Sequence, residues 1–339
     1  LYANASGTKL VAVGYRAMRS NTSGTDNTAI GTDAMYANTE GVRNIAIGAE
    51  AYDASDTEND NCAIGFASMT SNTAGGTLNV AVGNYTLDAL TSGDSNTAVG
   101  YNALTANTSG SGNCAFGSRA LQACHTGGAY NIAMGLSAGT SITTGTRNVM
   151  LGHDTAPSGT TGDRNICIGA EAGYSGSPGG NLTTGSNGIY LGPNEISAAH
   201  IQVDWTVASD ERDKTDVEPI TMGLDFVNKL EPVTYHWDKR TKYVSKEDLK
   251  DGSVDLNDVV HDGTHKEDWT DVGFLAQAVE KIEEDYGHKM SDKSNLTTHL
   301  TEDGAYGLTY AKFVPILTKA IQELSAKVEA QQSEIDTLK

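Results

Sequence analysis

A repeat of 17 or 18 residues runs through the N-terminal part of the chain and limits what it can fold into. The five-residue pattern Asn-x-Ala-Ile/Val-Gly, or a near variant, ends at ten regularly spaced glycines, and an Asn precedes nearly every one by four residues. These glycines are Gly14, Gly31, Gly48, Gly65, Gly83, Gly100, Gly117, Gly135, Gly152 and Gly169. A degenerate copy, Asn187 to Gly192, follows a Gly/Ser-rich insertion at 175–188. The chain must therefore begin as an array of similar units that stack on one another.

Each unit combines a short run of small and β-branched residues with a Gly turn and a Ser/Thr/Asn-rich turn, which is typical of a strand between corners. Stacking would place Ala on Ala, Ile or Val on Ile or Val, and Asn on Asn. We predict a mainly β shaft, either a parallel β-solenoid with 17-residue coils or an interwound trimeric β-fibre. The Asn column would form an internal hydrogen-bond ladder, and the Gly would take positive φ at a corner. Because the inward residues are small, we expect three chains to share one core.

The four cysteines support the array and not a chemical site. Cys62 and Cys114 take the variable position of the pattern, Cys167 takes its Ala position, and Cys124 lies outside it. We predict that they are small buried substitutes. The chain has no C-x-x-C spacing and no His at ligand distance from a cysteine, so we expect no disulfide framework, no metal and no cofactor.

Composition changes sharply near position 200, which indicates a domain boundary. Residues 1–200 contain 31 of the 38 Gly and 21 charged residues, whereas residues 201–339 contain 45 charged residues and all three Trp. The net charge of −20 opposes binding to a nucleic acid or an anionic membrane. No apolar run has the roughly 18 residues of a membrane span. Because the first residue is Leu and not Met, we expect a fragment or a processed product.

The last segment has a heptad pattern, because its apolar positions alternate spacings of three and four residues. The seam consists of Val314, Leu317, Ile321, Leu324, Val328, Gln331, Ile335 and Leu338. We predict a helix that begins near 312–314, with Pro315 in its first turn and Gln331 as a polar layer that fixes register. Charged flanks such as Glu323 favour a parallel trimeric coiled coil; the alternative is a single amphipathic helix on a globular core.

Residues 205–214, just past the array, read Trp-Thr-Val-Ala-Ser-Asp-Glu-Arg-Asp-Lys. This segment resembles the S-D-x-R-x-K signature of the intramolecular chaperone auto-processing domain at the C-termini of phage tailspikes and tail fibres, including endosialidases. Further matching blocks follow in order at 224–237, 273–280 and 308–324, so the resemblance covers 205–339. It implies an α+β domain that trimerises the preceding segment and then cuts itself off.

The resemblance also implies a catalytic pair, Ser209 and Lys214, with Arg212 as a supporting motif residue. A serine hydroxyl is a poor nucleophile until a base removes its proton, and a partly buried Lys with a lowered pKa can be that base. By resemblance the cut falls between Ser209 and Asp210; an N-to-O acyl shift at Ala208–Ser209 is the alternative. Asp213 stands where the family usually has Leu, and a carboxylate there favours the ammonium form of Lys214, so we expect cleavage that is slow or that needs a particular trimer geometry.

Two further groups of residues are expected to be structural. His236 lies between Tyr235 and Trp237, which favours packing over a role near the dyad. The acidic segment 241–270 is predicted to be a solvated insertion, since its spacing does not match a calcium loop. Its candidate ligands are Asp255, Asp258, His261, Asp262, His265 and Asp268.

These observations predict three domains: a receptor-facing β shaft at 1–200, a chaperone domain at 201–310 and a coiled-coil helix at 311–339. The expected function is that of a homotrimeric phage tail fibre, assembled in the host cytoplasm and carried on the virion with other tail proteins. The chain would act once on itself as a serine autopeptidase, and the shaft could contact a host glycan. The alternatives are an adhesin-like protein with an inactive chaperone and a glycan-cleaving tailspike, although the acids of the array recur as no pair on one face.

Overall fold

The computed structural model describes residues 2–72, 75–174, 180–193, 196, 200, 202, 206–245, 248, 254–301 and 304–339. Trp205 and the first part of the Gly/Ser-rich insertion, 175–179, lie outside the described residues. The chain divides into two compact units, of which the first is built mainly from residues before 197 and the second from most of the rest. Each is described by itself.

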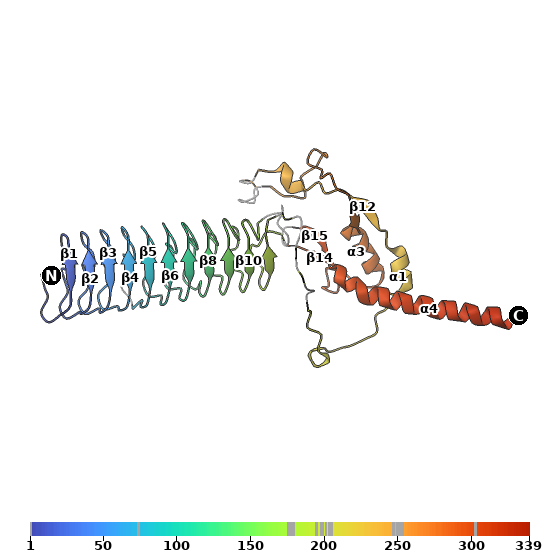
Figure 1. Cartoon of the computed structure of the whole chain (residues 1–339), viewed down its shortest axis with the longest axis horizontal. Helices are drawn as coiled ribbons and strands as arrows, with labels where there is room; N and C mark the ends of the chain where they lie inside the picture. The colour runs from blue at the N-terminus through green and yellow to red at the C-terminus, as the bar shows by residue number, and fades with distance from the viewer. Residues whose placement is uncertain are drawn as a thin grey trace. The chain divides into compact units, whose positions relative to one another are not determined.

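The first unit is a parallel β-solenoid in which every repeat adds one coil (Figure 1). Eleven three-residue strands pair in chain order into one parallel sheet. The strands are β1 (Val11–Val13), β2 (Thr28–Ile30), β3 (Ile45–Ile47), β4 (Cys62–Ile64), β5 (Val80–Val82), β6 (Thr97–Val99), β7 (Cys114–Phe116), β8 (Ile132–Met134), β9 (Val149–Leu151), β10 (Ile166–Ile168) and β11 (Ile189–Leu191). Of the two predicted architectures, the solenoid is confirmed.

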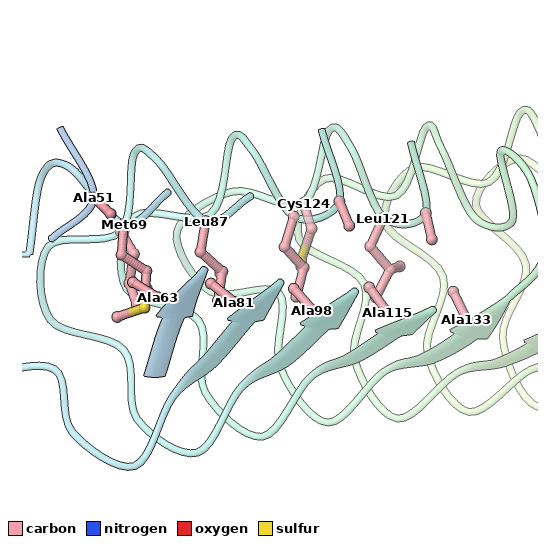
Figure 2. Packing of buried hydrophobic residues seen from close by; sticks show 14 of the residues in the cluster. Ala51, Ala63, Met69, Ala81, Leu87, Ala98, Ala115, Leu121, Cys124 and Ala133 are labelled. Atoms are coloured by element: carbon pink, nitrogen blue, oxygen red, sulfur yellow. The ribbon is translucent and has the colours of Figure 1, made fainter. Parts of the chain in front are cut away.

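The middle residue of each strand points into the coil and packs on its equivalent in the next. In β5 and β6, for example, Ala81 pairs with Ala98, and both are fully buried. Figure 2 shows these strand alanines facing larger side chains, such as Leu87 and Leu121, from the opposite side of the coil. The core is therefore a narrow layer between two walls, and it is closed within one chain and not shared among three.

A column of buried Asn side chains joins the coils, as the sequence predicted. Asn96 Nδ2 donates to Asn79 Oδ1 at 3.1 Å and to Gly110 O at 2.9 Å. Its Oδ1 accepts from the backbone N–H of Asn113 at 3.0 Å. The bond from a backbone N–H to the preceding Asn Oδ1 recurs from Asn27 to Asn165. The ladder thus satisfies turn groups that no strand pairing reaches.

The corner after each strand requires glycine. Gly100 has φ +130°, and a Cβ on it would lie 2.6 Å from the backbone carbon of Gly117 in the next coil. Two non-glycine residues of the same coil, Asn102 and Leu104, also have positive φ, at 56° and 53°. Equivalent positions recur along the solenoid, so each coil holds strained backbone that its neighbours stabilise.

The cysteines correct one expectation. Cys124 and Cys167 are buried in the core, and burial raises the pKa of each thiol to about 12. Cys62 and Cys114 occupy the first, outward position of β4 and β7 and are half-buried. The prediction of burial is therefore wrong for these two in a single chain, because the variable position of the repeat faces outward.

One coil departs from the pattern through buried polar groups. Tyr52 stands where other coils have Met or Leu, and its hydroxyl accepts from Asn61 Nδ2 at 2.5 Å and Asn72 Nδ2 at 3.3 Å. Glu58 replaces a turn glycine and is only 4% exposed. Its carboxylate accepts from nearby turn groups and from the backbone N–H of Gly75 at 3.1 Å, in the next coil. These bonds make this level of the solenoid distinct from the others.

The second unit is α+β and ends in a long helix. Its elements are η1 (Glu211–Asp213), α1 (Leu224–Lys229), β12 (Val233–Tyr235), η2 (Arg240–Tyr243), β13 (Asp271–Gly273), α3 (Ala276–Asp285), β14 (Thr298–Leu300), β15 (Tyr306–Leu308), η3 (Tyr310–Lys312) and α4 (Phe313–Thr337). Strands β12 and β13 pair antiparallel, as do β14 and β15. The core gathers Met222, Phe226, Val279, Phe313 and Ile316. The α4 helix begins where the heptad pattern placed it.

Removing one Asn from the ladder is expected to destabilise the solenoid. Asn96→Ala leaves the Gly110 carbonyl and the Asn113 N–H buried without these partners, at an expected cost of about 2–5 kcal/mol in the free energy of unfolding. Guanidinium unfolding followed by far-UV circular dichroism measures this cost. The control is Ser92→Ala, a partly exposed turn position of the preceding coil. Equal stability of the two variants would contradict a stabilising ladder.

Candidate functional site

A tight 3-10 turn shapes the segment that carries the motif. Asp210 caps η1, and its side chain accepts from the backbone N–H of Arg212 at 2.9 Å. The guanidinium of Arg212 also binds both Asp210 oxygens, with Nε–Oδ1 at 3.0 Å and Nη2–Oδ2 at 2.6 Å. The turn closes when Lys214 donates its backbone N–H to Glu211 O at 3.1 Å. The chain therefore doubles back within six residues.

This turn brings Ser209 and Lys214 together. Lys214 Nζ donates to Ser209 Oγ at 2.7 Å. No ion pair joins Lys214 to Asp213 among the residues that the structure describes. A hydroxyl and an amine at this distance can exchange a proton, which is the first requirement of a Ser–Lys nucleophile.

Arg212 neutralises Asp210 and takes no direct part in the dyad. Its side-chain and backbone hydrogen bonds lower the pKa of Asp210, and the same contact raises the pKa of Arg212. Both groups are thus charged at neutral pH and paired with each other. Arg212 acts as a brace for the turn that presents Ser209 and Lys214.

The dyad is open to solvent in a single chain. All residues from 206 to 219 are exposed. The geometry of the pair is therefore present in one chain, and both side chains are open to water there.

The other candidates named from the sequence lie elsewhere. His236 Nδ1 contacts Glu267 O at 3.0 Å, and its Nε2 contacts Thr270 Oγ1 at 3.4 Å. His261 pairs with Asp238 at 3.2 Å, and Asp238 also accepts from the Tyr243 hydroxyl and the Gly263 N–H. These contacts organise the acidic segment and involve neither Ser209 nor Lys214.

The acidic segment forms no metal-binding cluster within the described ranges. The six Asp and His side chains proposed there as candidate ligands are all exposed. No group of three or more His, Cys, Asp or Glu that could hold a metal ion occurs in the described part of the chain. None of its described helices combines the length and apolar content needed to cross a membrane.

A buried carboxylate, Glu283, was missed by the sequence reasoning. It lies on α3, is fully buried, and accepts from Thr297 N at 2.6 Å, Thr297 Oγ1 at 2.7 Å and Thr298 Oγ1 at 2.6 Å. Burial alone would raise the pKa of Glu283, but these hydrogen bonds outweigh it and the pKa is lowered. The ionised carboxylate thus fastens β14 to α3. The only sequence signal is its place beside apolar helix positions.

Glu323 is a second residue with a role that the sequence did not reveal. The heptad pattern predicts a charged flank, but its Oε2 accepts from the backbone N–H of Leu224 at 2.8 Å and so caps the start of α1. This hydrogen bond and the nearby Lys319 lower the pKa of Glu323. Phe313, Ile316 and Ala320 of the same helix are buried, so one side of α4 belongs to the domain.

The hydrogen bonds of Glu283 predict a pH-dependent contribution to stability. Because the folded pKa lies below the unfolded value of about 4.3, the contribution is complete above that value and is lost as pH falls through the folded pKa. Glu283→Gln should lose about 1–3 kcal/mol at pH 7, and less at pH 3. Urea unfolding followed by Trp fluorescence reports this domain alone, since all three Trp lie in it. The exposed neighbour variant Glu284→Gln should show no such difference, and a pH-independent loss in Glu283→Gln would contradict the assignment.

One comparison with known proteins found a family model that matches part of the C-terminal unit. Residues 209–288 match the family model described as chaperone of endosialidase, and the match begins at Ser209. No curated protein and no solved structure is significantly similar to the chain. The matched range contains the dyad turn, α1, the β12–β13 pair and α3. A match to the chaperone-of-endosialidase model over residues 209–288, following a parallel β-solenoid, fits a tail fibre with a C-terminal chaperone domain.

Proposed function

We propose that this chain is a tail-fibre subunit whose C-terminal domain assembles three copies and then releases itself by a single self-cleavage. The observation that carries the proposal is the Ser209–Lys214 contact at 2.7 Å, at the first residues of a chaperone-of-endosialidase match. The shaft serves host attachment on a virion, together with other tail proteins. A host glycan is the partner class suited to its Thr-, Asn- and Ser-rich turns.

The assembly step uses the free side of α4. Its seam residues are exposed in one chain, including Val314 at 62%, Ile321 at 66% and Val328 at 55%. An adjacent side of the helix carries the buried Phe313 and Ile316, so two neighbouring sides of the helix are apolar over its first half. The seam side has a heptad spacing that suits parallel helices, and it supports the predicted trimeric coiled coil at 311–339.

The covalent step follows from the dyad. Neutral Lys214 accepts the hydroxyl proton of Ser209, and Oγ attacks a backbone carbonyl carbon. The C–N bond breaks, the amine leaves with the proton held by Lys214, and water hydrolyses the resulting ester. The products are two chains with a new carboxylate and a new amine. Assembly would exclude water from the dyad and so favour the neutral amine.

The position of the cut depends on which hydroxyl attacks. The hydroxyl of Ser209 reaches the carbonyl of Ala208 through a five-membered ring, which is the N-to-O shift. Attack on the Ser209–Asp210 bond, the cut expected from the resemblance, requires a hydroxyl from another copy or a water activated by the dyad. Trimer formation would supply the first of these, and we keep Ser209–Asp210 as the proposed bond.

A glycan-cleaving role is less well supported by the shaft. A glycoside hydrolase needs two carboxylates held together over a groove. In the solenoid, Asp33 is bound by Arg16 and Asp60 by Arg43, both through two hydrogen bonds, and Asp94 accepts from Thr77. These carboxylates stabilise neighbouring coils and are not free to act as an acid–base pair.

Freshly made protein should separate into two fragments, residues 1–209 and 210–339, on denaturing electrophoresis. Ser209→Ala and Lys214→Ala should stay at full length, because each removes one half of the dyad. Intact-mass spectrometry distinguishes a cut after Ser209 from one before it. Asp213→Leu, which restores the residue usual in the family, should cleave faster. An uncut parent protein would refute self-cleavage and leave a chaperone without protease activity.

Disrupting the seam should prevent both trimer formation and cleavage. Ile321→Asp places a charge at the seam, whereas Gln322→Asp places the same residue one position away on an exposed side. Size-exclusion chromatography with light scattering should give a single subunit for the first variant and a trimer for the second. Normal cleavage in a monomeric Ile321→Asp protein would show that assembly does not activate the dyad.

A further inference from the structure

The solenoid has an apolar outer face that its own coils leave uncovered. In each strand the middle residue points inward and the two flanking residues point outward. In β7, for example, Phe116 is 52% exposed, whereas Ala115, the middle residue of the strand, is fully buried. In β1, the outward Val13 is 57% exposed. The strands pair in register, so the outward residues form two straight columns along the sheet.

None of the outward residues in the eleven strands is charged. The first column consists of Val11, Thr28, Ile45, Cys62, Val80, Thr97, Cys114, Ile132, Val149, Ile166 and Ile189. The second column consists of Val13, Ile30, Ile47, Ile64, Val82, Val99, Phe116, Met134, Leu151, Ile168 and Leu191. The second column is apolar throughout. We call the two columns together the strand face.

The strand face is large for a surface left in water. Eleven strands about 4.8 Å apart span about 48 Å, and three residues per strand give a width of about 10 Å. The projected area of about 500 Å² reaches the upper range of apolar patches on monomers, roughly 300–600 Å². Phe66 and Tyr101 directly follow corner glycines, and Tyr85 lies two residues after one. Tyr85 packs edge to face on Phe66 and on Tyr101, with ring centroids 5.4 and 6.0 Å apart. They widen the apolar strip in the middle coils.

Charge is kept to other parts of the coil. The ion pairs Arg16–Asp33 and Arg43–Asp60 join successive coils at positions outside the strands. Residues 1–200 contain 7 basic and 14 acidic residues, so copies that meet through an uncharged surface avoid placing like charges in direct contact. The strand face is such a surface. The strand faces of two copies also have the same spacing between strands, so they can match along the whole sheet.

We propose that the strand face is the contact through which three copies of this shaft pack side by side, parallel and with equivalent coils at the same level. The inference rests on the proposed function, because the exposed α4 seam is what brings parallel copies together. A stable interface buries roughly 800 Å² of surface per partner. The accessible area of the strand face is of that order once pleating and the flanking aromatic rings are added to its projected area. The shaft trimer would then consist of three closed solenoids around a common apolar axis.

Two native cysteines report this arrangement. Cys62 and Cys114 both lie in the first column, in β4 and β7, so their levels are three strand spacings or about 14 Å apart. In a parallel trimer with equivalent coils side by side, Cys62 of one copy lies near Cys62 of the next, and Cys114 near Cys114. Cys124 and Cys167 are buried within each chain and remain unreactive.

The test treats the full chain, held uncut by Ser209→Ala, with a short flexible bismaleimide. Peptide mapping should find Cys62–Cys62 and Cys114–Cys114 links and no Cys62–Cys114 links. Val99→Lys, in the second column between the two thiols, should reduce linking at least tenfold, whereas Ser92→Lys in a turn should not change it. The chain lacking both outward thiols, Cys62→Ser with Cys114→Ser, is the control for the buried pair.

The outcomes separate this inference from the function on which it rests. A trimer by light scattering with no links, or with mixed Cys62–Cys114 links, would overturn the packing of the strand faces while leaving assembly through α4 intact. A single subunit with no links would overturn both. Links that persist in Val99→Lys at the parent level would also contradict the proposal, because a lysine on the apolar axis costs too much to leave the contact unchanged.

Discussion

The stacking of each coil on the next is the constraint from which the rest of this molecule follows. Strand pairing holds one side of the coil, and the Asn column holds the turns, since Asn96 bridges the coils on both sides of it. Neither interaction is strong alone. Because both recur at every level of the solenoid, each coil depends on its neighbours for stability. The strained corner positions persist for the same reason, because the coils above and below fix them.

The same repetition creates an alignment problem that the proposed function assigns to the C-terminal unit. A narrow core of alanines facing Met and Leu leaves the β-branched residues of each strand on the outside. Repeats that look alike offer many nearly equivalent ways for copies of the chain to align. A clamp at one end, as proposed for α4, would remove that ambiguity before the faces meet. In the proposed function, the clamp is no longer needed once they have met, and the proposed cut at its base would leave the shaft kinetically trapped.

Much of this architecture could be predicted from the sequence, because the same residue pattern recurs in every coil. The inward Ala, the Asn ladder, the corner glycines and the start of α4 each depend on local pattern alone. The closed core could not be predicted, since small residues such as Ala98 suit a shared core equally well. The left-handed backbone at Asn102 and Leu104 has no residue signature, because the neighbouring coils impose it.

The candidate site divides in the same way. Ser209 and Lys214 were predicted from the resemblance of their segment to a family signature, and a capped turn brings them together. The roles of Glu283 and Glu323 depend on partners distant in the sequence, Thr297 and Leu224, so no local pattern announces them. Burial was wrongly predicted for Cys62. Side chains alternate between the two faces of a strand, so the first residue of a three-residue strand points outward when the middle one points into the core. Burial depends on such details of direction more than on residue type.

The central claim is that closed single-chain solenoids become one shaft by covering their strand faces against each other. Electron cryo-microscopy of the uncut Ser209→Ala protein tests it most directly. The account predicts threefold symmetry along the shaft, with the eleven strands of every copy turned toward the axis and the charged turns outside. A lone solenoid, or a trimer with its strand faces turned to solvent, would contradict it.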